Sequence, residues 1–279
     1  MALFKCLRDM YRPCATASLG IVEFYIGMQR RHFLQATGLA LGGLGVSLPF
    51  ATQSLAQATS LTIRWLFHSC VLFQADNLTI LVNPFRPLGC TEGYPMPEVP
   101  ADFVLLSSRL LDEGAITSVV GNPRVLFEAG DFRVGGLRLQ GVRMPHDALG
   151  GNQFGSNIAW RWTMGGIDIV HLGGAAAPLS REQQILLNRP DVMFVPVGGG
   201  PKNYDADGAI AAIEALSPKL VIPTMYRTAA AGESCELVGI DEFLQKLQGI
   251  SVTTLPSNQL SLTASQLPEA GAIVNVFPS

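Results

Sequence analysis

The chain has 279 residues, of which 48% are hydrophobic and 15% charged, and its formal net charge is -3. This composition is typical of a globular protein and excludes both a disordered chain and a strongly basic nucleic-acid-binding protein. The 29 glycines and 18 prolines favour many short elements joined by tight turns over a helical bundle.

The first distinctive segment begins at the paired arginines Arg30 and Arg31, which a stretch without charged residues follows as far as residue 63. This stretch contains the sequence Leu55-Ala56-Gln57-Ala58, a small-x-small pattern suited to signal peptidase. The arrangement predicts a twin-arginine signal, with a Sec signal or an N-terminal anchor as alternatives. Pro49 and Gln53 interrupt the apolar run, so no stable membrane span is expected after cleavage.

Cleavage at this site would divide the chain into a signal, residues 1–58, and one mature domain, residues 59–279. Met28 would begin a signal of ordinary length, so the first 27 residues are either a misassigned start or a long n-region. The expected partner is the twin-arginine export machinery, and the expected location is the periplasm or an equivalent lumen. Cys70, Cys90 and Cys235 remain in the mature part, where one disulfide could form from a pair that the sequence does not identify.

The mature part begins with strand patterns, short runs rich in β-formers separated by turn residues. They fall at residues 61–65, 70–74, 78–82 and 103–106, then as a meander over 125–141 and a hairpin over 157–163 and 167–172. Predicted helices at 180–188, 205–216 and 240–248 then alternate with strands at 192–195, 220–223 and 251–255. A β-rich half followed by α/β alternation predicts an α/β four-layer sandwich, with two sheets packed face to face and helices outside.

Five segments share their order with one known family, at residues 65–70 (WLFHSC), 80–85 (ILVNPF), 171–174 (HLGG), 196–199 (PVGG) and 221–226 (VIPTMY). Together they resemble the metallo-β-lactamase superfamily, and within it the ascorbate-6-phosphate lactonase-like, Zn-dependent hydrolases. The resemblance extends over residues 61–228. It implies an αββα sandwich and an active site in which the ends of successive strands bind two zinc ions.

Most of the metal ligands that this resemblance implies are missing. The family's ligand positions fall on Ser108, Leu110, Asp112, Glu113, His146, Gly174 and Met225, of which only Asp112 and His146 keep the family's residue. Structural zinc is held by four side chains and catalytic zinc usually by three. The loss argues against dinuclear hydrolysis by a metal-activated hydroxide.

The remaining polar residues allow three interpretations. Asp112, Glu113 and His146 could hold one weakly bound zinc or other divalent metal, with His146 and Asp112 catalytic in the hydrolysis of a small ester, lactone or phosphorylated molecule. Alternatively, the histidines are hydrogen-bonded remnants and the chain is a pseudoenzyme or binding protein. Finally, Ser107 or Ser108 could be a nucleophile activated by a histidine, although no G-x-S-x-G elbow is present.

Further residues are expected to line the same cleft, namely His68, Ser108, His171, Lys202 and Tyr226. Lys202 follows the sequence Gly198-Gly199-Gly200-Pro201, whose backbone amides could accept an anion together with it. Close packing of the backbone is the simpler interpretation of these glycines. The sequence therefore predicts an exported protein with a small-molecule ligand, and it leaves the metal open.

Overall fold

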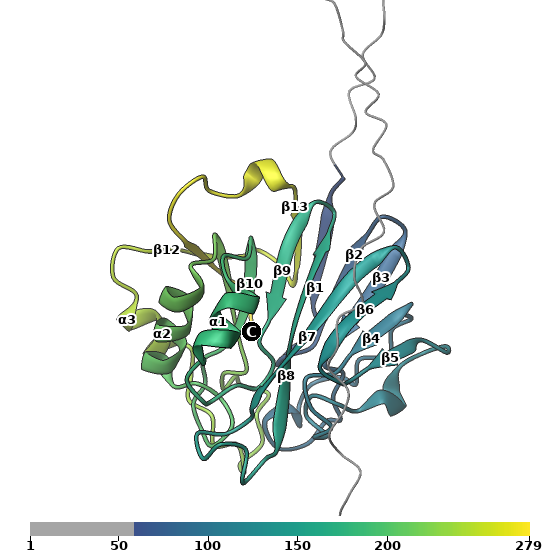
Figure 1. Ribbon diagram of the computed structural model, residues 1–279. Coiled ribbons are helices and arrows are strands. Elements are labelled where there is room, and N and C mark those ends of the chain that lie inside the picture. The colour runs from purple at the N-terminus through teal and green to yellow at the C-terminus, as the bar shows by residue number, and fades with distance from the viewer. Residues whose placement is uncertain (1–58) are drawn as a thin grey trace, which may run out of the picture. The chain divides into compact units, whose positions relative to one another are not determined.

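The computed structural model describes residues 59–279 of the chain. Its first sheet consists of five early strands and one strand from near the C-terminus. The predicted signal, with Arg30 and Arg31, lies outside the described residues. Six strands lie in the order β13-β1-β2-β3-β4-β5 (Figure 1). Their bounds are Leu61–Trp65 (β1), Val71–Ala75 (β2), Leu78–Val82 (β3), Phe103–Leu105 (β4), Arg124–Leu126 (β5) and Gln259–Leu262 (β13).

The second sheet has eight strands in the order β12-β14-β11-β10-β9-β8-β7-β6. They are Gly130–Val134 (β6), Leu137–Pro145 (β7), Ser156–Met164 (β8), Ile167–His171 (β9), Val192–Pro196 (β10), Leu220–Thr224 (β11), Ser251–Thr254 (β12) and Ile273–Val276 (β14). Strands β6 to β9 are antiparallel, whereas β10, β11, β14 and β12 continue the sheet in parallel. Every residue of β10 and β11 is buried, as expected for strands covered on both faces.

Three helices lie beside the parallel half of this sheet: α1 (Arg181–Leu187), α2 (Ala206–Leu216) and α3 (Asp241–Lys246) (Figure 1). The first two begin with a side-chain N-cap. Ser180 forms a capping box with Gln183, and the Asp205 side chain accepts a hydrogen bond from the backbone N–H of Gly208. None of the helices in the described part is long and apolar enough to cross a membrane.

The core lies between the sheets, where Trp65, Phe73, Trp160, Trp162 and Phe194 are all buried. The predicted fold class is confirmed, with one difference in its layers. A smaller apolar cluster lies on the other side of the first sheet, where Cys70, Leu72 and Leu81 pack with Phe85 and Tyr94 of the loop at residues 83–101. Within residues 59–279, this loop takes the place of a helical layer on that face.

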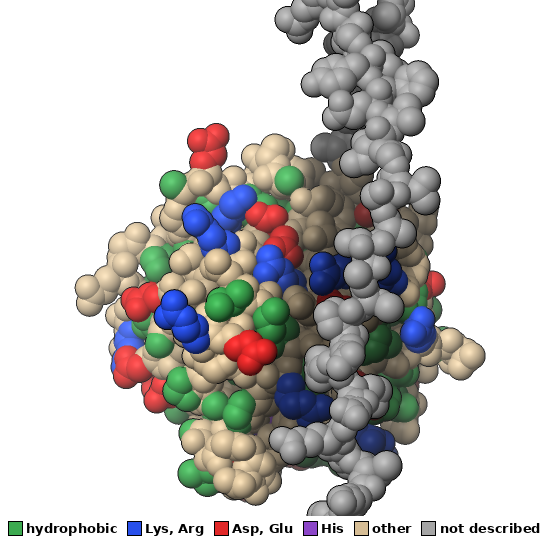
Figure 2. Space-filling model, viewed as in Figure 1, with side chains coloured by type: hydrophobic (Ala, Val, Ile, Leu, Met, Phe, Trp, Pro, Cys, Tyr) green, Lys and Arg blue, Asp and Glu red, His purple; other side chains and the backbone are tan. Residues whose placement is uncertain are grey.

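Among the coloured atoms of Figure 2, the Lys and Arg side chains are interspersed with Asp and Glu and form no large patch of one charge. Mixed charge agrees with the small net charge of the chain.

Candidate functional site

Strand ends that are distant in the sequence meet at one buried carboxylate, that of Glu113. The loop after β4 carries Ser108 and Glu113, His146 directly follows β7, and Gly174 follows β9. In α/β sheets, ligand sites characteristically form at the carboxyl ends of strands. The family resemblance placed its metal ligands at these same positions.

Glu113 and His146 form a closed pair at this point. One carboxylate oxygen, Oε1, accepts a hydrogen bond from Ser108 Oγ at 2.6 Å and also contacts His146 Nε2. The other, Oε2, accepts a hydrogen bond from the backbone N–H of Gly174 at 3.0 Å. Both side chains have no exposed surface, so the two charges lie entirely inside the protein.

Backbone geometry on each side holds this pair together. Gly114 lets the loop after β4 fold back tightly, because a Cβ there would lie 2.3 Å from the carbonyl oxygen of Ser108. Asp147 organises the loop after His146, since its carboxylate accepts hydrogen bonds from the backbone N–H groups of Leu149, Gly151, Gln153 and Phe154. The Phe154 ring at the end of this loop lies 6.2 Å from the His146 ring, between centroids.

The electrostatics of the pair favour the charged forms of both residues. Burial by itself would raise the pKa of Glu113, but the charge of His146 and its hydrogen bond outweigh burial and lower the pKa to about 2. Burial by itself would lower the pKa of His146, yet the Glu113 carboxylate raises it above its usual value. The geometry therefore favours a charged pair joined through His146 Nε2, while Nδ1 of the same ring is buried without a hydrogen-bond partner among the described residues.

Asp112, the residue before Glu113, points elsewhere. Its Oδ2 atom forms an ion pair with Lys202 Nζ and lies 3.9 Å from His68 Nε2. This corrects the predicted metal site of Asp112, Glu113 and His146, whose side chains are divided between two separate clusters. Within residues 59–279, no group of three or more His, Cys, Asp or Glu side chains is placed to hold a metal ion.

A cavity of about 440 Å³ opens beside the Asp112–Lys202 pair. It is lined mainly by apolar side chains, and the lining includes Leu88, Leu110, Leu111, Phe154 and Leu237. Of the residues predicted to line the cleft, Lys202 does so, together with Asp112. The apolar part of the lining was not predicted, because leucines scattered over distant loops give no signal in a single sequence.

Other predicted cleft residues are buried behind this cavity. His68 and Ser108 are almost fully buried and do not line it. The Tyr226 ring stacks on Trp65, which also stacks on Phe277, and the Tyr226 hydroxyl donates to the carbonyl oxygen of Phe277 at 3.4 Å. These placements correct the prediction that the three residues line the cleft.

His171 is a structural residue in this arrangement. It has no exposed surface, its Nε2 donates to the Ser69 carbonyl at 3.1 Å, and its Nδ1 accepts from the backbone N–H of Gly173 at 3.1 Å. Burial lowers the pKa of His171 to about 4, so the imidazole is neutral near pH 7. Its predicted place on the cleft surface is therefore also corrected.

The serine-nucleophile interpretation finds no support in the geometry. Ser108 Oγ donates to Glu113 and not to a histidine. Ser107 Oγ accepts a hydrogen bond from Asn83 Nδ2 at 3.1 Å. A nucleophilic serine needs its hydroxyl hydrogen-bonded to a general base in the manner of a triad, and neither serine hydrogen-bonds to a histidine among the described residues.

One covalent link stabilises the wall of the cavity. Cys90 and Cys235 form a disulfide that joins the loop after β3 to the loop after β11, and Cys70 is a buried free thiol. The sequence predicted that one disulfide could form and left its partners open. The bond fixes both loops where they border the cavity.

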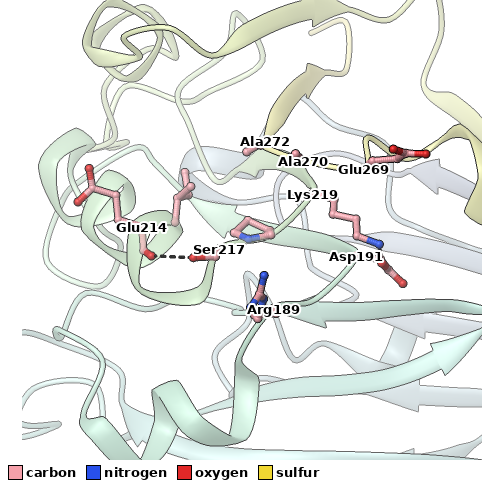
Figure 3. A pocket seen from close by; sticks show the side chains of 11 residues that line it. Arg189, Asp191, Glu214, Ser217, Lys219, Glu269, Ala270 and Ala272 are labelled. Atoms are coloured by element: carbon pink, nitrogen blue, oxygen red, sulfur yellow. Dashed lines mark hydrogen bonds and ion pairs between the residues drawn. The ribbon is translucent and has the colours of Figure 1, made fainter.

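A second cavity, of about 400 Å³, lies at the opposite ends of the parallel strands, just before β10, β11 and β14 (Figure 3). Its charged groups are partly paired with each other, since Lys219 Nζ lies 2.8 Å from an Asp191 carboxylate oxygen. Ser217 Oγ donates to the Glu214 carbonyl at 3.1 Å. This cavity contains none of the residues discussed above and carries no functional argument.

Comparison with known proteins identifies the family. The family model described as a β-lactamase superfamily domain matches residues 62–225, more than half of the chain. The chain belongs to the metallo-β-lactamase superfamily. A protein of Archaeoglobus fulgidus described as a UPF0173 metal-dependent hydrolase is 26% identical over 194 residues, which cover 60% of this chain and 83% of the relative. A relative in Methanoculleus marisnigri with the same description is 28% identical over 192 residues, 61% of this chain and 82% of the relative.

Solved structures of the superfamily agree with this assignment. One from Thermotoga maritima, described as a Zn-dependent hydrolase of the superfamily, has a TM-score of 0.62 and 27% identity, and the match covers 78% of this chain and 98% of that one. Another from Parabacteroides distasonis has a TM-score of 0.52 at 18% identity, covering 78% of this chain and 93% of that one, and shows the shared fold. This superfamily member therefore has the common fold, with Ser108, Glu113, His146 and Gly174 at its strand ends.

Proposed function

We propose that this chain is an exported metallo-β-lactamase-fold protein that does not carry out metal-dependent hydrolysis and instead binds a small molecule in the cavity beside Asp112 and Lys202. The observation that carries the proposal is the buried Glu113–His146 pair. Its atoms occupy the place where the family resemblance expects metal ligands, and they are hydrogen-bonded to each other.

The two zinc ions that the family implies do not fit the residues present. The ligand positions occupied by Ser108, Leu110, Gly174 and Met225 offer neither imidazole nor carboxylate, and zinc binds through nitrogen, thiolate or carboxylate groups. Both oxygens of Glu113 and the Nε2 atom of His146 are engaged in the closed network. Binding a metal there would require the buried pair to separate.

Gly174 provides an independent argument. A Cβ at this position would lie 2.5 Å from His146 Cε1 and 3.0 Å from Glu113 Oε2. The bridging aspartate of the family therefore has no room while the pair is formed. The absence of an aspartate at position 174 and the close approach of Glu113 to His146 therefore depend on each other.

Two features support export. The arginine pair Arg30-Arg31 with its small-x-small site has the pattern of a twin-arginine signal. The Cys90–Cys235 disulfide is of a kind that persists in oxidising compartments such as the periplasm and is rare in the cytosol. The proposed location is the periplasm or an equivalent lumen.

The alternative is a residual hydrolase, which the descriptions of the relatives as metal-dependent hydrolases and the resemblance to the lactonase-like branch favour. A panel of esters, lactones and phosphoesters, assayed with added zinc or manganese, separates the two functions. We expect no turnover above that of the His146→Ala variant. Metal-dependent turnover by the parent protein that the variant lacks would establish the hydrolase instead.

A further inference from the structure

The cavity beside Asp112 and Lys202 has the dimensions of a small-molecule site. Its volume of about 440 Å³ falls within the range of roughly 300 to 1,000 Å³ that such sites occupy. The loop after β4 contributes Leu110, Leu111 and Asp112 to its lining. The loop after β11 contributes Ser234, Glu236 and Leu237. The Cys90–Cys235 disulfide links the second loop to the segment around Leu88 to Cys90, which forms another part of the wall.

The walls favour an apolar ligand. Leu88 and Leu111 line the cavity and remain 42% and 49% exposed, although side chains of this size normally gain free energy by burial. Leu110, Leu237 and Phe154 extend the apolar surface inward. An aliphatic chain or ring in the cavity would cover these side chains.

The charges at the inner end cancel. Lys202 Nζ pairs with Asp112 Oδ2, and the same ammonium group lies 5.9 Å from the centroid of the Phe154 ring. The other charged residue of the lining is Glu236, which is exposed. An anionic ligand would meet two carboxylates, and a cationic ligand would have to compete with Lys202 for Asp112.

A buried polar atom without a partner lies directly behind this pair. His68 is 3% exposed, and its Nε2 atom has no hydrogen-bond partner among the described residues. The 3.9 Å between His68 Nε2 and Asp112 Oδ2 is too long for a hydrogen bond. His68 does not itself line the cavity, so a hydroxyl or carbonyl group of a ligand at this end would hydrogen-bond to the Lys202–Asp112 pair in front of it.

We infer that the cavity binds a neutral amphipathic molecule, with its apolar part against Leu110, Leu111 and Leu237 and one uncharged polar group at the Lys202–Asp112 pair. This inference rests on the proposed binding function and specifies the class of ligand. The matched balance of one ammonium and one carboxylate is the feature that selects an uncharged head group.

The test compares three probes with one chain length, 1-octanol, octanoate and octylamine, by titration calorimetry on the purified full chain at pH 7. We expect 1-octanol to bind with a dissociation constant at least about tenfold below those of the two charged probes. Leu111→Asp should abolish binding, because it places a charge in the apolar wall. Ile185→Asp, at a 68% exposed side chain of α1 outside the cavity, is the matched control and should leave binding unchanged.

Charge variants test the selectivity directly. Asp112→Asn leaves Lys202 unpaired and should shift the preference about tenfold towards octanoate, whereas Lys202→Met should shift it towards octylamine. Equal binding of the three probes, no binding of 1-octanol, or binding unaffected by Leu111→Asp would overturn the inference. Those outcomes would leave the proposed absence of metal hydrolysis intact, since that claim is tested separately, by metal-dependent turnover and by metal content.

Discussion

His146 Nε2 and Glu113 Oε1 form a hydrogen-bonded ion pair in which neither side chain reaches solvent. Taking two charges out of water is costly, and an attraction at short range with further hydrogen bonds is needed to offset that cost. Ser108 and the Gly174 backbone provide those hydrogen bonds. The pair and its hydrogen bond from Gly174 join the loop after β4 to the ends of β7 and β9.

Removing one partner of this pair should strongly destabilise the fold. In Glu113→Ala, an unpaired imidazole and the unsatisfied groups of Ser108 and Gly174 would remain buried. We therefore expect the free energy of unfolding to fall by about 3–5 kcal/mol. Urea denaturation measures the difference. The control is Asp131→Ala, which breaks the exposed ion pair with Arg138 and should cost at most about 1 kcal/mol. If Glu113→Ala lowered the free energy of unfolding by less than Asp131→Ala does, Glu113 would not stabilise the strand ends.

The same pair predicts a stability window in pH. The lowered pKa of Glu113 adds stability that is present above the usual value of 4.5 and lost as pH falls towards about 2. The raised pKa of His146 adds stability that is present below 6.5 and lost as pH rises through the folded value. The stability difference between the parent and Glu113→Gln should therefore be largest between about pH 4.5 and 6.5. A difference that grew steadily up to pH 9 would contradict this assignment of charges.

Restoring the missing aspartate should not restore a metal site. In Gly174→Asp, the new side chain would enter the space held by His146 and Glu113, and overpacking of this kind costs typically about 1–3 kcal/mol before any cost of burying the charge. Thermal unfolding with and without zinc measures the effect. Gly239→Asp is the control, because a Cβ at Gly239 meets no atom within 4 Å. A Gly174→Asp variant that zinc stabilised above the parent protein would count against the rearranged site.

The disulfide should contribute to stability independently of the buried pair. Cys90 and Cys235 are separated by 145 residues, and loss of a native disulfide typically costs about 2–5 kcal/mol. Cys235→Ser should lower the denaturation midpoint accordingly, and a reducing agent should shift the midpoint of the parent protein but not that of the variant. Equal shifts in both proteins would indicate that the reductant acts elsewhere.

Much of the fold could be predicted from sequence because its signals are local. The alternation at residues 61–65 and the caps at Ser180 and Asp205 each specify one element without long-range information. Strands β13 and β14 were not predicted, because the strands with which they pair lie elsewhere in the sequence and give no local signal. Leu61 pairs with Leu262, and Ile273 lies between the strands of Leu220 and Ser251.

The candidate site was predictable only in part. The resemblance indicated which sequence positions correspond to the family's metal ligands, but not the directions in which the side chains at those positions point. Asp112 and Glu113 are neighbours in sequence, yet one turns to Lys202 and the other to His146. The apolar cavity depends on loops brought together by a disulfide whose partners the sequence left open. The Asp147 loop had a usable signal, because an aspartate shortly before Gly150 and Gly151 favours a turn in which its carboxylate binds backbone amides.

The most direct test of the central claim is the metal content of the purified protein, measured by elemental mass spectrometry on material prepared without a chelator or a histidine tag from zinc-supplemented cells. If the Glu113–His146 pair has replaced the metal centre, the folded protein should contain far less than one equivalent of any divalent metal, and the His146→Ala variant should not differ from it. One or more equivalents of metal per chain, lost in His146→Ala, would contradict the account and identify a working metal site in this superfamily member.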